Sequence, residues 1–422
     1  MAKAIVFDDG RGELSPLTDL RPSFDVRTGA LTTLDRLKRS LDLEILGLFV
    51  PDALIELATA AHDEPVNQPI DGDPDDPVVA INGRCVLPLE LFADLETGQV
   101  LIEQSTGDMV AAALSLEEMR SFLSGGNPGL SSIEIEEEVL LSRPWHFRRF
   151  RDRAIQMDLS LMLGEQDQDD DLVPEGVLCL GDHRILIDPE AEVYRGVVLN
   201  AEHGPIVIGA NATIRPLAVV NGPCVIGRGC TVFEHANIKP NTAVGPVCKI
   251  GGEIGACVFQ GYANKAHEGH LGDSWIGEWV NLGAGTTNSN LLNTYSEVVA
   301  KATPEGKNER TGETFLGCVL GDHVKTAIGT RIMTGAIANT GVMFAASQAL
   351  SGTLPAFAWI TDAGTKPFRV GKFVEVAMTA MGRRGVDQTT AYARRLTLLH
   401  EQATGQDSAV SWPGKPGAST DA

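Results

Sequence analysis

The chain has 422 residues, 43% of them hydrophobic, so it can form two or three domains with full cores. Its 56 acidic and 34 basic residues give a net charge of −22, which argues against a nucleic-acid partner, because phosphate backbones bind to clustered Lys and Arg. No apolar run approaches the roughly 18 residues of a membrane helix, and residues 1–9 predict a first strand in place of a signal peptide. Seven cysteines without a C-x-x-C pair indicate reduced thiols and a cytoplasmic protein.

Residues 1–163 alternate short apolar runs with amphipathic stretches, which predicts an α/β domain with a largely parallel sheet. Strands are expected at 4–7, 43–50 and 77–81, and helices at 30–39, 52–61 and 116–123. A charged run followed by Pro and Gly indicates an acidic linker over 164–176.

A period of six residues then dominates the chain. Large aliphatic residues recur at Ile208, Ile214, Val220, Ile226, Val232, Ile238, Val244 and Ile250. Four residues after them stand small ones: Ala212, Ala218, Cys224, Cys230, Ala236, Thr242 and Cys248. This period fits neither an α-helix nor an ordinary strand, and it predicts a parallel β-helix of hexapeptide repeats over 177–352, left-handed as such helices are. The aliphatic residue fills the interior of a triangular prism, and the small one lets the chain turn the corner.

Two interruptions break this repeat. Ile250 and Ile276 are 26 residues apart, two more than four hexads, which predicts an insertion or loop. A second, polar interruption covers 293–314. Loops that leave a rigid scaffold carry binding groups, so we expect function near these breaks. Residues 353–400 are expected to form a helical segment that caps the open end of the prism, and 401–422 a disordered tail.

The segment between the interruptions reads NKAHEGHLGD at 264–273 and WIGEWVNLGAG at 275–285. It resembles the acetyltransferase half of the bacterial family of bifunctional N-acetylglucosamine-1-phosphate uridylyltransferases/glucosamine-1-phosphate acetyltransferases. The resemblance implies that His267 is a general base and Asn281 a sugar contact. It also implies that Ala284 and Asn290 contact acetyl-coenzyme A. His270 stands where the family has a Tyr, and we count it as a further substrate contact.

The chemistry of acyl transfer agrees with this motif. An amine must lose its proton before it attacks a thioester, and histidine is the side chain that accepts a proton near neutral pH. A sugar phosphate also needs cations, and Lys249 and Lys265 flank the interrupted coil. The resemblance therefore implies an acetyl-coenzyme A-dependent N-acetyltransferase for an amino-sugar phosphate of cell-envelope synthesis, assembled as a homotrimer.

The α/β domain carries a glycine-rich loop directly after its first strand. It contains Gly10, Arg11 and Gly12 and resembles the phosphate loop of sugar nucleotidyltransferases, where glycines let backbone N–H groups approach a nucleotide. The loop is one residue short and lacks the usual Thr-Arg pair. Arg21 and Arg27 are candidates for phosphate contacts in place of the usual Lys.

Several alternatives stay open. Asn82 stands where nucleotidyltransferases have a metal-binding Asp, so UTP and Mg²⁺ are expected only if this domain has kept its activity. The whole chain could also be a non-catalytic scaffold that binds sugar nucleotides. A third possibility is a zinc enzyme of the carbonic-anhydrase type, in which His235, His267 and His270 ligate the metal.

Overall fold

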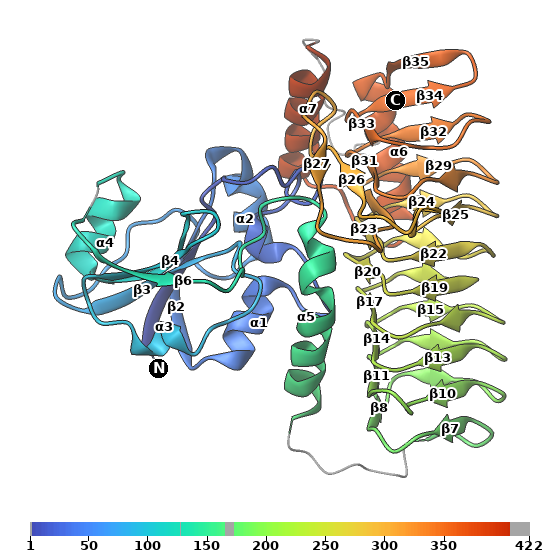
Figure 1. Ribbon diagram of the computed structural model, residues 1–422, viewed down its shortest axis with the longest axis horizontal. Helices are drawn as coiled ribbons and strands as arrows, with labels where there is room; N and C mark the ends of the chain where they lie inside the picture. Colours follow the sequence, from blue (N-terminus) through green and yellow to red (C-terminus); the bar gives the residue numbers. More distant parts are fainter. Residues whose placement is uncertain (1, 127, 165–172, 406–422) are drawn as a thin grey trace, which may run out of the picture.

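The computed structural model describes residues 2–126, 128–164 and 173–405 (Figure 1). An α/β domain comes first, with a six-stranded sheet in the order β2-β1-β3-β5-β4-β6. Its strands are β1 (Ala2–Phe7), β2 (Leu43–Phe49), β3 (Pro77–Asn82), β4 (Gln99–Glu103), β5 (Met109–Ser115) and β6 (Ser131–Ile135). Its helices are α1 (Thr33–Ser40), α2 (Ile55–Ala61), α3 (Leu91–Asp94), α4 (Leu116–Leu123) and α5 (His146–Leu163), with short 3₁₀ turns at Ser23–Asp25 and Asp52–Leu54.

Side-chain alternation along the strands explains the three layers of this domain. Ala4 and Val6 of β1 pack with Leu37 of α1 on one side of the sheet, whereas Ile5 packs with Met119 of α4 on the other. All six elements expected from the sequence overlap observed elements of the same kind. The prediction of a largely parallel sheet was wrong for β5, which is antiparallel to both neighbours. A short loop joins β4 to β5, and such a connection pairs strands only in antiparallel fashion.

The β-helix has three sheets, which we call its first, second and third faces. The first face contains β7 (Leu178–Leu180), β10 (Val198–Asn200), β13 (Val219–Asn221), β16 (Asn237–Ile238), β19 (Glu253–Gly255) and β22 (His270–Gly272). The second contains β8 (Ile185–Ile187), β11 (Ile206–Ile208), β14 (Cys224–Ile226), β17 (Thr242–Val244), β20 (Val258–Phe259), β23 (Trp275–Ile276), β28 (Cys318–Leu320), β31 (Ala336–Ala338) and β33 (Thr353–Leu354). The third contains β9 (Glu192–Val193), β12 (Thr213–Ile214), β15 (Thr231–Val232), β18 (Lys249–Ile250), β21 (Asn264–Lys265), β24 (Asn281–Leu282), β29 (Lys325–Thr326), β32 (Met343–Ala345), β34 (Ala358–Thr361) and β35 (Gly364–Pro367). A further parallel pair is β25 (Thr287–Asn288) with β30 (Arg331–Ile332).

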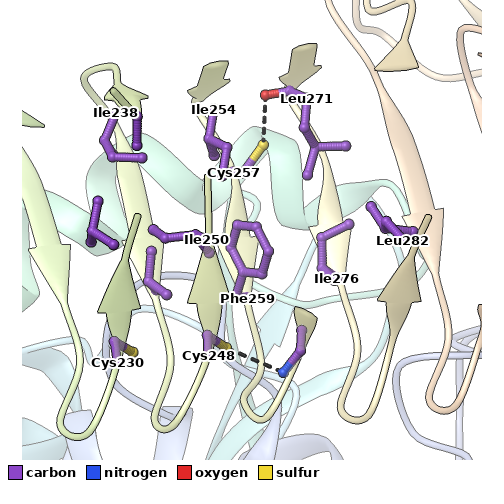
Figure 2. Close-up of a cluster of buried hydrophobic side chains, with 14 of the residues drawn as sticks. Cys230, Ile238, Cys248, Ile250, Ile254, Cys257, Phe259, Leu271, Ile276 and Leu282 are labelled. Atoms are coloured by element: carbon purple, nitrogen blue, oxygen red, sulfur yellow. Dashed lines mark hydrogen bonds between the residues drawn. The ribbon is translucent and has the colours of Figure 1, made fainter. Parts of the chain in front are cut away.

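The register of these strands confirms the predicted left-handed β-helix. Ile208 pairs with Ile226, and Ile226 with Val244, so one coil takes three hexads. The aliphatic residues fill the interior, where Ile238, Ile254 and Leu271 stack on successive coils (Figure 2). At the corners, the residue before each small one often adopts left-handed backbone angles, although it is seldom glycine; examples are Asn211, Leu217, His235 and Asn241.

The first interruption is a shortening of the coils and not the insertion that we expected. Val244 pairs with Phe259 and Ile250 with Lys265, each fifteen residues on in place of eighteen. A Cβ at Gly251 would lie 2.2 Å from the carbonyl oxygen of Ala266 in the next coil, so this turn requires glycine. The spacing of the aliphatic residues did not reveal this shortening, because Lys265 takes an interior position that aliphatic residues hold elsewhere.

The second interruption is a true excursion from the β-helix. It holds the antiparallel pair β26 (Val299–Ala300) and β27 (Glu309–Arg310). Val298 of this excursion and Leu316, just after it, pack in one cluster with Trp145 and Phe147 of the α/β domain. The excursion therefore helps to fasten the α/β domain to the β-helix.

Helix α5 lies between the sheet of the α/β domain and the second face of the β-helix (Figure 1). Ile155 and Leu159 pack on Val207 and Val225 of that face. Further along the helix, Nη1 of Arg151 donates to the carboxylate of Asp273 at 2.8 Å. The two domains are thus joined along the side of the prism.

The C-terminal region differs from the prediction in two ways. Strands β33–β35 occupy residues that we expected to be helical, because the coils continue beyond 352. The helices that follow are α6 (Val370–Gly382) and α7 (Thr390–Thr404), and α6 lies along the third face and does not cap the open end of the prism. Residues 401–404 belong to α7 and not to the tail, whereas 406–422 and 165–172 of the linker lie outside the described residues. None of the helices within the described ranges combines the length and apolar character needed to cross a membrane.

Candidate active site

Four outward-pointing residues form a row on the third face: Lys249, Asn264, Asn281 and Lys325, which we call the polar row. They lie on neighbouring strands, since β18 pairs with β21, β21 with β24 and β24 with β29. Residues alternate sides along a strand, so the residue after each of them points into the prism. With about 4.8 Å between strands, the polar row spans about 14 Å. Nδ2 of Asn264 donates to Oδ1 of Asn281 at 2.8 Å.

A cavity of about 530 Å³ lies between the polar row and α6, and we call it the basic cavity. The α6 residues that line it recur every three or four positions and so share one side of the helix. They are Lys372, Glu375, Val376, Thr379 and Ala380, followed by Arg383 and Arg384 just past the helix. The neighbouring side of α6, with Phe373 and Ala377, is buried against other parts of the C-terminal region and fixes the helix in place.

Positive charge prevails in the basic cavity, although the chain as a whole is strongly acidic. Its single carboxylate, Glu375, pairs with Lys372 at 2.8 Å. The other cations that line it have no carboxylate within 4 Å among the described residues; they are Lys249, Lys325, Arg383 and Arg384. Burial lowers the pKa of Lys325 to about 8, and burial, together with the two arginines, lowers the pKa of Lys249. An anionic ligand would neutralise these charges.

Aromatic rings form another part of the cavity wall. Tyr262 and Trp279 stack with their ring centroids 4.4 Å apart and an interplanar angle of 19°. Trp279 is also stacked on His323, whose Nε2 lies 2.8 Å from the hydroxyl of Tyr392 in α7. His323 is buried, and its pKa is lowered well below the usual value by desolvation, so it supports the wall as a neutral ring.

The candidate base His267 lies at the corner that follows β21, three residues after Asn264. Its side chain is exposed and has no hydrogen-bond or ion partner within the part of the chain that the structure describes. Asn264 pairs with Asn281 on the neighbouring strand. The residues three positions after them, His267 and Ala284, therefore occupy the same corner on neighbouring coils. The predicted base and a predicted coenzyme contact are therefore neighbours along one edge of the prism.

Lys265 does not have the role that we predicted. It is 2% exposed, and its Nζ donates to the carbonyl oxygens of Gly251 at 3.1 Å and His267 at 2.7 Å. Burial lowers its pKa to about 8. An ammonium group inside the prism cannot reach a phosphate in the basic cavity. Lys265 instead fixes the backbone of the corner that carries His267.

Two other predicted residues lie apart from the basic cavity. His270 is on the first face, where its Nδ1 lies 3.4 Å from Oε1 of Glu253. Asn290 donates from Nδ2 to Oδ2 of Asp273 at 2.8 Å. Their roles as substrate and coenzyme contacts stay predictions, as do those of Asn281 and Ala284.

The glycine-rich loop of the α/β domain is held by a network of charges. Gly10 and Gly12 adopt positive φ angles of 64° and 80°, which explains the two glycines. Arg84 is fully buried and donates from Nε and Nη2 to Asp9 at 2.8 and 2.7 Å. Asp108 accepts from Arg84 at 2.6 Å and from the exposed Arg11 at 2.8 Å. Arg84 thus forms ion pairs with both carboxylates beside the loop, Asp9 and Asp108.

These residues do not fit a magnesium ion. The amide of Asn82 donates to Asp9 and to the carbonyl oxygen of Met109, and its oxygen accepts from the backbone of Arg84. Across the described residues, no three His, Cys, Asp or Glu side chains are grouped so that they could ligate a metal. The alternative of a zinc site is therefore contradicted for His235, His267 and His270.

Arg21 and Arg27 are not phosphate contacts either. Arg21 is buried and pairs with Asp322 at 2.9 Å and with Glu278 at 3.3 Å, both in the β-helix. Nη1 of Arg27 donates to the carbonyl oxygen of Ala30, and its backbone N–H to Gln260 at 2.9 Å. Both arginines fasten the two domains together. They stand close to the glycine-rich loop in sequence, but the fold turns them away from it.

The geometry defines a class of protein: an α/β domain beside a left-handed β-helix that has a basic cavity on one face. Comparisons with known proteins agree, since residues 4–166 match the family model described as sugar nucleotidyl transferase. The bifunctional protein GlmU of Rippkaea orientalis is 27% identical over 163 residues, which are 34% of this chain and 35% of that protein. The bifunctional sugar-1-phosphate nucleotidylyltransferase/acetyltransferase of Sulfurisphaera tokodaii is 33% identical over 134 residues, 31% of this chain and 33% of that protein.

These matches span about a third of the length of the curated relatives. A shorter stretch of 94 residues, 22% of this chain, is 37% identical to GlmU of Sphingopyxis alaskensis, of which it covers 21%. Over these stretches the chain is similar to parts of the GlmU proteins.

Proposed function

We propose that the chain is an acetyl-coenzyme A-dependent N-acetyltransferase that acts on an amino-sugar phosphate. The observation that carries this proposal is the position of Lys249 and Asn281 in one basic cavity, with His267 at the next corner of the same coils. Cations suit a phosphate, amides suit sugar hydroxyls, and the exposed imidazole suits an ammonium group that must lose a proton. The name of the Sulfurisphaera tokodaii relative, which pairs nucleotidyl and acetyl transfer, supports the same choice.

In this mechanism, the polar row holds the sugar phosphate and presents its amino group to the corner. His267 accepts the proton of the amine as its nitrogen attacks the thioester carbonyl, and the C–S bond then breaks. The proton passes to the departing thiolate of coenzyme A. Lys265 supports this step indirectly, because its bond to the carbonyl oxygen of His267 fixes the corner.

Nucleotidyl transfer by the α/β domain, which would give a UDP-sugar for cell-envelope synthesis, meets an obstacle. Arg84 occupies Asp9 and Asp108, so the pair would have to open before a nucleotide and its metal could enter. For assembly, we propose the homotrimer that the resemblance implies. The second face is covered by α5 and the third partly by α6, which leaves the first face as the surface for contacts between subunits.

The test is an assay of purified protein with glucosamine-1-phosphate and acetyl-coenzyme A, in which free thiol is followed, and pyrophosphate separately after addition of UTP and Mg²⁺. His267→Ala should lower thiol release by about 10²- to 10⁴-fold, which is the usual contribution of a general base. The control is His203→Ala, which removes another exposed histidine. Unchanged thiol release by His267→Ala would refute the proposed base, and ligand binding without any turnover would favour the scaffold alternative.

A further inference from the structure

We propose that Arg383 and Arg384 at the end of α6, together with Lys249 of the polar row, form a phosphate-binding site for a phosphorylated sugar. The C-terminal helix is then part of the ligand site and not only a structural addition to the β-helix. The phosphate site itself stands on the geometry of the basic cavity. Only the choice of an amino sugar as the group that carries the phosphate rests on the proposed function.

The first argument is the gathering of cations at one end of the cavity. α6 runs along the third face, and its C-terminal end lies close to Lys249, where the charges of Arg383 and Arg384 oppose protonation of that lysine. No carboxylate within the described ranges pairs with any of the three. Like charges brought together in this way repel one another unless an anion joins them. Guanidinium groups bind phosphate oxygens in pairs, which suits two adjacent arginines.

The second argument is the chemistry next to these cations. Asn264 lies one strand from Lys249 and Asn281 two strands away, at about 5 and 10 Å. Side-chain amides both donate and accept hydrogen bonds, as hydroxyl groups do. The stacked rings of Tyr262 and Trp279 add an apolar wall. A sugar ring with several hydroxyls and one phosphate matches this arrangement of amides, aromatic rings and cations.

The experiment compares ligand binding by the intact protein and by Arg383→Ala/Arg384→Ala, using calorimetry and thermal unfolding. Glucosamine-1-phosphate, glucosamine, inorganic phosphate, UDP-N-acetylglucosamine and coenzyme A are tested separately. A matched control, Lys366→Ala/Arg369→Ala, removes two exposed charges that do not line the cavity. We expect the arginine variant to bind glucosamine-1-phosphate about 10- to 100-fold more weakly, and the control to bind it as the wild type does.

Without ligand, the arginine variant should unfold at the same temperature as the wild type or a higher one, because repulsion with Lys249 is removed. A clear loss of stability without ligand would overturn the proposal, since the arginines would then be structural. Unweakened binding of glucosamine-1-phosphate would also overturn it, and so would weakened binding of coenzyme A alone. Weakened binding of UDP-N-acetylglucosamine alone would overturn the choice of a sugar phosphate. If binding depends on the arginines but no acetyl transfer occurs, the proposed function fails and this site stands.

Discussion

The buried ammonium of Lys265 gives a prediction that can be worked out from the structure. Burial lowers its pKa to about 8 from the usual 10.5, and each tenfold change in proton affinity is worth 1.36 kcal/mol. The folded state therefore binds the proton of Lys265 about 3 kcal/mol less favourably than the unfolded state. Between pH 8 and 10.5 the unfolded chain carries a proton that the folded chain lacks. The stability of the wild type consequently rises with pH through this window.

Replacing Lys265 with Met keeps a long side chain in the prism and removes the titrating group. The free energy of unfolding, from urea titrations at pH 7 to 10, should then lose this pH-dependent contribution. The difference in stability between variant and wild type should shift by about 2 kcal/mol in favour of the wild type as the pH rises from 8 to 10. In Lys366→Met, where an exposed lysine is replaced, the curve should run parallel to that of the wild type. Parallel curves for Lys265→Met would refute the reasoning.

Three further substitutions test the core of the β-helix, a buried ion pair inside the α/β domain and the cavity. Phe259→Ala should lower the free energy of unfolding by about 3–5 kcal/mol, because the ring is fully buried inside the shortened coils; a loss below 1 kcal/mol in urea titrations would contradict that packing. Arg36→Met should cost about 3–5 kcal/mol, since Asp158 would stay buried without its partner at 2.7 Å, and unchanged urea midpoints would contradict this. Asn281→Ala should raise the KM for glucosamine-1-phosphate about tenfold at an unchanged melting temperature, because the amide is exposed; an unaltered KM would remove Asn281 from the site.

The fold of the β-helix could be predicted because every coil needs large aliphatic residues in its interior and small residues at its corners. Helix α5 could not, because it is buried between two domains and its inner positions include the charged Arg151 and Asp158. Those charges find partners in Asp273 and Arg36, which lie far away in sequence. The apolar stripe that usually marks a helix in a sequence is therefore interrupted in α5, because ion pairs with distant residues replace apolar contacts there.

The candidate site was accessible to sequence analysis only in part. Asn281 and Lys249 could be found from the repeat and the motif, and both line the basic cavity. Lys325 and the pair Arg383–Arg384 were missed, because they reach the cavity only once α6 has packed along the third face. The alternation within the hexads was an available signal for Lys325, since it takes the same outward position one strand after Asn281.

Helix α5 also sets a limit on the length of the β-helix. Residues of this helix and its surroundings contact Val207, Val225 and Ala243, which mark three successive coils on the second face. Further along, Arg151 reaches Asp273. An extra coil of 18 residues between these points would displace every later coil by about 4.8 Å relative to the helix and separate that ion pair. Because α5 contacts the β-helix at both ends of this segment, the number of coils between residues 207 and 273 is fixed, although the regular repeat alone would allow coils to be gained or lost.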